Sequence, residues 1–328
     1  MMSRKKVLVA LSGGVDSAVS AALLKKQGFD VFGAHFLFFD PALRERRGEA
    51  DGSLKKAKLV AEKLNIPLEI VDAKKEFKKK IIDYFIHYAR LRREFSIFNF
   101  QFSNNFKISK FKNVKLLEAK DKLKDQSYFL YRLTQRELAK IVFPLGDYKK
   151  SEVKKLAKKF KLPVFGDEES QDICFLADSD INKFLRKNIK PASGNIIDEK
   201  GNMLARHKGL PFYTIGQRKG IEIGGKGPYF VIGKNRRKNQ LIVSDDSKRL
   251  SSKMFSVNKV NWISKETKLP LSAQIQIRYH AEKISAIIKK DKKGEYSVET
   301  AKSLRAVTPG QSTVFYKNNE VLGGGIIV

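Results

Sequence analysis

The chain has 328 residues, of which 42% are hydrophobic, and this size and composition suit two or three globular domains. Lys and Arg outnumber Asp and Glu by 66 to 35, and a formal charge of +31 favours a polyanionic partner, although lysine-rich solvated helices would give the same surplus. A single cysteine excludes an internal disulfide and a cysteine-based zinc site. Without an apolar leader or a membrane-length apolar stretch, we expect a cytoplasmic protein with no membrane partner.

The first segments alternate between strand and helix. The expected elements are a strand at 7–11, a helix at 17–27 ended by Gly28, a strand at 31–39, a helix over 54–64 and a strand at 67–71. This β-α-β-α-β order predicts a Rossmann-like parallel sheet with right-handed crossovers. Ligands of such sheets bind beyond the carboxyl ends of the strands.

A glycine-rich loop follows the first strand at that edge. It comprises Ala10, Leu11, Ser12, Gly13, Gly14, Val15, Asp16 and Ser17. Two glycines let the backbone approach an anion, and the N–H groups and dipole of the next helix face the same point. Such a nest suits the phosphate tail of ATP. The loop differs from a P-loop, because it lacks the Gly-Lys-Ser/Thr ending, and from a dinucleotide site, because it lacks the three glycines. The alternative is a turn that binds nothing.

The later segments change in character. A helix at 76–86 precedes a Phe-, Asn-, Ser- and Lys-rich stretch at 94–113, for which we expect an exposed excursion. We then expect a strand at 114–119, helices at 127–140 and 151–160, a small central module from about 184, and strands at 273–279, 285–289 and 314–316. These alternating strands predict a C-terminal antiparallel β-barrel. The predicted domains are residues 1–178, 179–248 and 249–328.

Several strings resemble, in order, the tRNA-specific 2-thiouridylases of the MnmA type, which belong to the PP-loop ATP pyrophosphatases. They are ALSGGVDSAVSAALL (10–24), KDQSYFLYRL (124–133), FPLGDYKKSEV (143–153), SQDICF (170–175), GLPFYTIGQRKGI (209–221), VTPGQSTVFY (307–316) and LGGGII (322–327). The resemblance covers nearly the whole chain. It implies a PP-loop α/β domain, a small central module and a C-terminal β-barrel.

The resemblance also implies a reaction. ATP with Mg²⁺ adenylates the C2 oxygen of the wobble uridine of tRNA, and a persulfide sulfur then displaces AMP to give 2-thiouridine. Cys174 matches the catalytic persulfide carrier, whereas the residue type alone fits a small buried apolar side chain equally well. The sulfur would come from a persulfide-donating relay protein or a cysteine desulfurase.

Binding residues follow from the same resemblance. The loop residues 10–17 and Phe36, as an apolar adenine wall, would bind ATP, and Asp16 would order the loop or hold Mg²⁺. The positions that correspond to tRNA contacts are His87, Lys124, Asp125, Gln126, Arg278, Tyr279 and Gln311. The alternatives are a structural His87, an Asp125 that caps the following helix, and solvated barrel residues at 278 and 311.

One family segment is missing between Ile86 and His87. It carries an Asn-Pro-Asp-x-x-Cys-Asn motif with the catalytic Asp and a second cysteine, followed by a helix and a strand. Its loss predicts an unpaired first strand, unless residues 81–86 close the sheet, or the sequence reflects a faulty gene model or a degenerate gene. Two rival functions follow: a tRNA- and ATP-binding protein without sulfur transfer, and a PP-loop enzyme that adenylates a small molecule.

Overall fold

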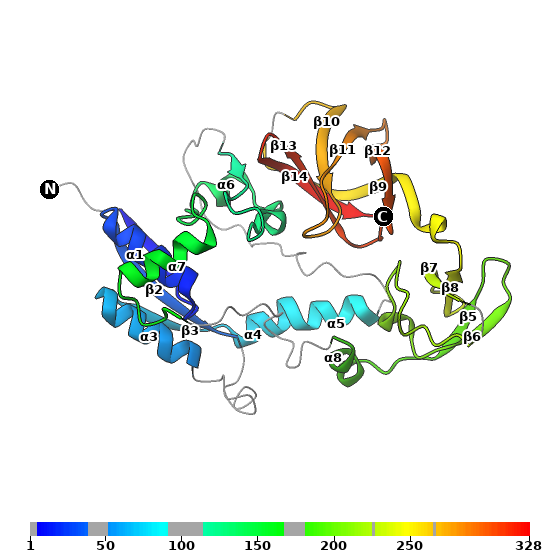
Figure 1. The fold of residues 1–328 in the computed structure, drawn as a ribbon, viewed down its shortest axis with the longest axis horizontal. Helices are drawn as coiled ribbons and strands as arrows, with labels where there is room; N and C mark the ends of the chain where they lie inside the picture. The colour runs from blue at the N-terminus through cyan, green and yellow to red at the C-terminus, as the bar shows by residue number, and fades with distance from the viewer. Residues whose placement is uncertain (1–4, 39–51, 91–113, 167–180, 225–226, 265–266) are drawn as a thin grey trace. The chain divides into compact units, whose positions relative to one another are not determined.

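The computed structural model of the chain describes residues 5–38, 52–90, 114–166, 181–224, 227–264 and 267–328. Two compact units emerge from its contacts. The first comprises residues 1–82, 118–126 and 141–172, and the second comprises residues 83–117, 127–140 and 173–328. Figure 1 shows the helices and strands of both units.

The first unit is built on a parallel sheet with the strand order β1-β2-β3. Its elements are β1 (Lys6–Ala10), α1 (Val15–Lys26), β2 (Asp30–Leu37), α3 (Gly52–Leu64), β3 (Leu68–Asp72), α4 (Lys74–Phe77), the π-helical turn η2 (Lys78–Ile82) and α7 (Lys150–Lys159). The parallel sheet expected at the N-terminus is therefore confirmed, with boundaries within a few residues of those predicted.

Helices α1, α3 and α7 share one hydrophobic core with the sheet (Figure 1). Small buried residues such as Ala18, Ala21 and Ala57 let these helices approach closely. Val9 of β1 is buried in this core, whereas Leu8, which points to the opposite face, is 63% exposed. Parallel sheets are normally covered on both faces, so the exposure of one face of β1 is unusual.

One side of β1 has no strand partner among the described residues, as predicted from the missing family segment. Among the described residues β1 pairs with β2 alone, so it forms the edge of the sheet. The alternative that residues 81–86 close the sheet is wrong, because η2 and α5 (Asp83–Arg90) make that stretch helical.

The second unit contains a closed six-stranded antiparallel barrel, which confirms the expected C-terminal fold. Its strands are β9 (Ser251–Trp262), β10 (Leu271–Gln276), β11 (Ile284–Lys290), β12 (Tyr296–Arg305), β13 (Ser312–Lys317) and β14 (Glu320–Ile327). The order β13-β10-β11-β12-β9-β14 closes through a β13–β14 pairing. Alternating residues such as Ile275, Ile288 and Phe315 fill the interior.

A small four-stranded sheet with the order β6-β5-β8-β7 precedes the barrel in the chain. The elements of this region are α8 (Ile181–Asn188), β5 (Gly194–Ile197), β6 (Met203–His207), the 3₁₀ turn η4 (Leu210–Phe212), β7 (Phe230–Asn235), β8 (Gln240–Ser244) and the 3₁₀ turn η5 (Ser247–Leu250). The GLPFYTIGQRKGI string supplies Leu210, Tyr213 and Ile221 to its core, so these three residues serve the fold.

Residues 114–140 differ from the prediction. The expected strand is reduced to β4 (Leu116–Leu117), which pairs with β14, and the helix expected at 127–140 is wrong. In its place are the 3₁₀ turn η3 (Ser127–Leu130) and the short helix α6 (Gln135–Leu138). Tyr128 and Tyr131 bury their rings against the barrel, and both hydroxyls hydrogen-bond to Ser312. Thr134 then starts α6 with a capping box.

The barrel offers a test of its core with a matched control. Ile288 is fully buried, whereas its neighbour Ile287 is 41% exposed on the outer face. We expect Ile288→Ala to lower the free energy of unfolding by about 2–5 kcal/mol and Ile287→Ala by about 1 kcal/mol or less. Trp262, the single tryptophan, packs on Phe315, so its fluorescence during denaturant titration reports this transition. Equal losses in the two variants would contradict the assigned faces.

Candidate functional site

The glycine loop between β1 and α1 is shaped by its two glycines in different ways. Gly13 has φ +85° and is so close to Ser53 that a Cβ there would collide with the Ser53 carbonyl oxygen. A Cβ at Gly14 would meet only the Ser12 hydroxyl, at 3.4 Å. The fold therefore requires the first glycine, and the second leaves the mouth of the loop open.

Hydrogen bonds anchor the loop to β2. The Leu11 N–H donates to the Ala34 carbonyl at 2.8 Å, and the Nδ1–H of His35 donates to the Leu11 carbonyl at 2.7 Å. Within the loop, the Ser17 hydroxyl donates to the Gly14 carbonyl at 3.0 Å. His35 is buried, and sequence reasoning missed it, because a single His in an apolar strand gives no functional signal.

Helix α1 starts directly after Gly14, and no side chain caps it. The first N–H groups of a helix have no intrahelical acceptor, and the helix dipole makes this end attractive to anions. Asp16 lies in the first turn and is 57% exposed. The residues present thus fit a phosphate group that is accompanied by a cation.

Lys150 is the second residue that the sequence did not single out. Its Nζ donates to both carboxylate oxygens of Asp16, at 2.6 and 2.8 Å, and its side chain is only 16% exposed. Its backbone N–H donates to Asp121 Oδ2 at 2.8 Å, and this bond is the main cause of a lowered pKa of Asp121. The available signal was a cation in the first turn of α7, where the helix dipole disfavours it.

Phe36 lies near the carboxyl end of β2, two residues beyond the position that pairs with the end of β1. It is half-buried, and its ring is parallel to that of Phe38 with 6.0 Å between the centroids. Phe38 in turn contacts Phe77 at 4.8 Å. The structure therefore brings Phe36 to the edge of the sheet that carries the glycine loop.

Lys124, Asp125 and Gln126 belong to a short turn of the first unit. The Ala119 N–H donates to Asp125 Oδ1 at 2.8 Å, so Asp125 ties the two ends of this turn together. Lys124 and Gln126 are exposed. The single helix that Asp125 was expected to cap does not form.

In the second unit the structure brings Arg278, Tyr279 and Gln311 together. The Arg278 guanidinium donates to Gln311 Oε1 at 3.2 Å and to the Ala306 carbonyl, so neither side chain is merely solvated. The half-buried Tyr279 contacts Phe129, with 4.4 Å between ring centroids, and His280, at 3.9 Å. Such an aromatic group beside an arginine can stack on nucleic acid bases.

Of the remaining predicted residues, only His87 belongs to the described part of the chain. His87 lies on the exposed side of α5 in the second unit. Cys174 and residues 94–113 lie outside the described residues. Gly166 lines a cavity of about 100 Å³ together with Val15 of the glycine loop.

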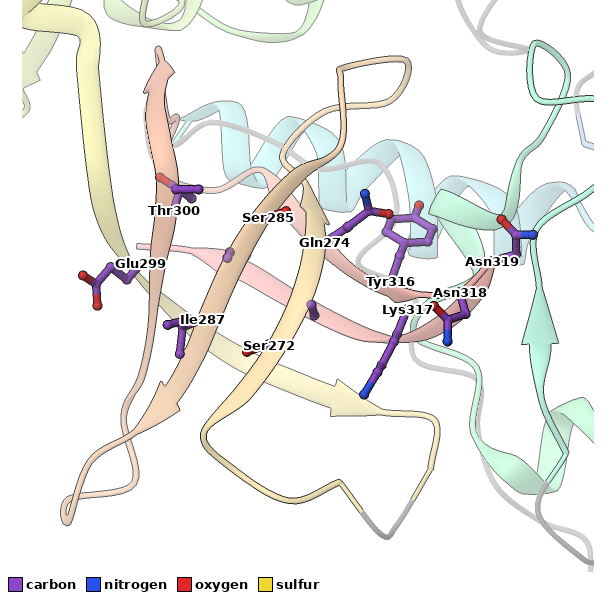
Figure 2. Close-up of a pocket in the computed structure, with 13 residues that line it drawn as sticks. Ser272, Gln274, Ser285, Ile287, Glu299, Thr300, Tyr316, Lys317, Asn318 and Asn319 are labelled. Carbon is purple, nitrogen blue, oxygen red and sulfur yellow. The ribbon is translucent and has the colours of Figure 1, made fainter.

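A wider groove crosses the outer face of the barrel (Figure 2). Its volume is about 610 Å³, and its lining includes Ser272, Gln274, Ser285, Glu299 and Lys317. None of the predicted site residues lines it. In the described part of the chain, no three His, Cys, Asp or Glu residues could jointly hold a metal ion, and no helix is long and apolar enough to cross a membrane.

Three family profiles match successive parts of the chain. The profile described as "tRNA methyl transferase HUP domain" matches in two stretches, residues 5–93 and 87–178. The "tRNA methyl transferase PRC-barrel domain" matches residues 182–245, and the "Aminomethyltransferase beta-barrel domain" matches residues 252–327. The two stretches of the first profile overlap directly after Ile86, where the sequence predicts missing family residues.

Relatives match over nearly their whole length. The tRNA-specific 2-thiouridylase MnmA of Carboxydothermus hydrogenoformans is 35% identical over 362 aligned positions, which cover 100% of this chain and 98% of the relative. MnmA 2 of Clostridium tetani is 36% identical over 354 positions, with 99% of each chain covered. Because these alignments are longer than the 328 residues here, the relatives carry residues that this chain lacks. The solved NMN synthetase of Francisella tularensis matches 52% of this chain and 67% of its own at 18% identity, with a TM-score of 0.29.

The Asp121 carboxylate gives a pH-dependent test of the site. Its pKa lies below the ordinary 3.8, so its stabilising effect is complete above that value and is lost as the pH falls through the folded-state pKa. We expect Asp121→Asn to melt below the wild type at neutral pH, and the difference in Tm to narrow as the pH falls below 3.8. Calorimetry at stepped pH measures this difference, and a gap that stays constant into acid would contradict the assignment.

Proposed function

The chain belongs to the tRNA-specific 2-thiouridylase family, and on this basis we propose that it uses ATP to replace the C2 oxygen of the wobble uridine of tRNA with sulfur. The observation that carries the proposal is the end-to-end match to relatives of that name, in a chain whose first loop has the geometry of a phosphate cradle. The profile descriptions mention methyl transfer, but this cradle suits a triphosphate.

The adenylation step needs residues that bind the phosphates, the adenine and the Mg²⁺ ion. Loop residues 10–17 would hold the phosphates of ATP, and Phe36 would contact the adenine. Mg²⁺ is usually held by one or two carboxylates together with the substrate phosphates, which suits Asp16 as a single protein ligand. Adenylation makes the uridine oxygen part of a good leaving group, and this lowers the barrier to its displacement.

The RNA would be held by charge and by stacking. The net charge of +31 supports a polyanionic substrate. The proposed contacts are the exposed residues Lys124 and Gln126 in the first unit and the half-buried Arg278 and Tyr279 in the second, together with Asp125, His87 and Gln311. The wobble base has to leave its stack to react, and aromatic side chains stabilise such an unstacked base.

The sulfur step depends on Cys174. A persulfide on this residue would attack C2 with its terminal sulfur, the C2–O bond would break, and AMP would leave with the oxygen. The product is then joined to Cys174 by an S–S bond, which a second thiol must cleave. The chain has one cysteine, so this thiol has to come from outside it, as does the persulfide, which we assign to a sulfur relay protein or a cysteine desulfurase.

The presence of a single cysteine favours a second candidate function. A chain without the second cysteine and the Asn-Pro-Asp-x-x-Cys-Asn segment could keep ATP and tRNA binding and lose sulfur transfer. The two candidates agree on both ligands and differ in the product alone.

Thiolation in vitro separates the candidates. With tRNA, ATP, a persulfide donor and added thiol, we expect mass spectrometry to find 2-thiouridine at the wobble position, and we expect Cys174→Ala to abolish it. Omitting the external thiol should limit the yield to less than one product per protein. If the wild type binds ATP and tRNA but forms no thiouridine under any of these conditions, the non-catalytic candidate holds instead.

Tyr279 gives a test of RNA binding with a conservative control. Removing a base-stacking ring costs about 1–3 kcal/mol, so Tyr279→Ala should weaken tRNA binding about 5- to 150-fold, whereas Tyr279→Phe keeps the ring and most of the affinity. The salt dependence of binding should be the same in both variants, because no charge is removed. Filter binding at several salt concentrations measures both quantities, and equal affinity of the alanine variant and the wild type would remove Tyr279 from the interface.

A further inference from the structure

Lys150 is held in an unusual position for a lysine. Its side chain is 16% exposed, it lies in the first turn of α7, and the helix dipole there opposes a positive charge. Burial of an ammonium group is unfavourable unless an opposite charge compensates it. Asp16 supplies that charge through two hydrogen bonds to the Lys150 ammonium.

The Asp16 carboxylate remains accessible to a ligand although it is paired with Lys150. It is 57% exposed and belongs to the loop that would hold the phosphates. A polyphosphate that enters this loop meets a carboxylate of the same sign, so it binds well only if that charge is neutralised. Lys150 provides the neutralising charge in the free protein, and a divalent cation that arrives with the nucleotide can replace it on the carboxylate.

Building on the proposed function, we propose that Lys150 is an ATP-binding residue that exchanges partners: its ammonium leaves Asp16 for the phosphates when Mg²⁺ with ATP arrives, and Asp16 turns to the Mg²⁺. The Asp121 carboxylate holds the Lys150 backbone N–H, so the exchange involves the long side chain and leaves the helix in place. Lysine suits this role, because its compact charge and flexible stem can serve two anions in turn.

A purely structural ion pair predicts a different pattern. In that case, loss of either partner would lower stability by a similar amount and would leave nucleotide affinity unchanged. Under partner exchange, loss of Lys150 weakens nucleotide binding. Loss of the Asp16 charge then has opposite effects on the two forms of the nucleotide, because it removes a Mg²⁺ ligand and also frees Lys150 for the phosphates.

The test is calorimetric binding of α,β-methylene-ATP to the full-length protein, with Mg²⁺ and with EDTA. We expect Lys150→Met to weaken binding of the Mg²⁺ complex about 10- to 100-fold, the range for loss of one hydrogen bond between charged groups. Lys155→Met removes the same charge from an exposed position of the same helix and should bind like the wild type. Asp16→Asn should bind the Mg²⁺-free nucleotide more tightly than the wild type and should gain little from added Mg²⁺.

The outcomes separate this inference from the proposed function. If the wild type binds no nucleotide, the proposed function fails. If the wild type binds and Lys150→Met binds equally well, partner exchange is wrong while the function stands. Should Lys150→Met not fold, as judged by circular dichroism, the Asp16→Asn variant decides, because unchanged affinity for the Mg²⁺-free nucleotide leaves only a structural ion pair.

Discussion

The first unit depends on one close contact between backbones. Gly13 has a positive φ and lies directly against the Ser53 carbonyl at the start of α3, a position that no side chain could share. This contact sets the bend after β1, and His35 and Ala34 fix the same bend to β2. The loop is therefore shaped by the packing of the domain before any ligand arrives. Such preorganisation spares a ligand the entropy loss of ordering the loop.

A chain of charged contacts connects this loop to the turn at residues 118–126. Asp121 accepts the backbone N–H of Lys150, and the Lys150 side chain holds Asp16 in the first turn of α1. Asp125 closes the same turn, next to two of the proposed tRNA contacts. The proposed nucleotide and RNA contacts of this unit thus share one framework of hydrogen bonds. A change of partner at Lys150 would therefore alter a hydrogen bond within this framework.

Local patterns in the sequence were enough to predict much of this architecture. The glycine loop between a strand and an alanine-rich helix predicted the start of the parallel sheet, and alternating residues predicted the barrel. The helix expected at 127–140 failed because Tyr128 and Tyr131 bond to Ser312, more than 180 residues away, and no local pattern reveals such a contact. Lys150 escaped notice for a similar reason, since it is one of many lysines and only the fold pairs it with Asp16.

The exposed side of β1 has a consequence for how copies of the chain behave in solution. An edge strand with an exposed Leu8 is a template onto which a further strand can add. Natural proteins often blunt such edges with charge, and here Lys6 on the same strand and the large positive surplus of the chain would keep copies apart by mutual repulsion. Dissolved ions weaken that repulsion over distances beyond about 8–10 Å. The colloidal stability of this protein therefore depends on ionic strength. Concentrated salt weakens the repulsion between copies, and the sheet edge itself does not prevent their association.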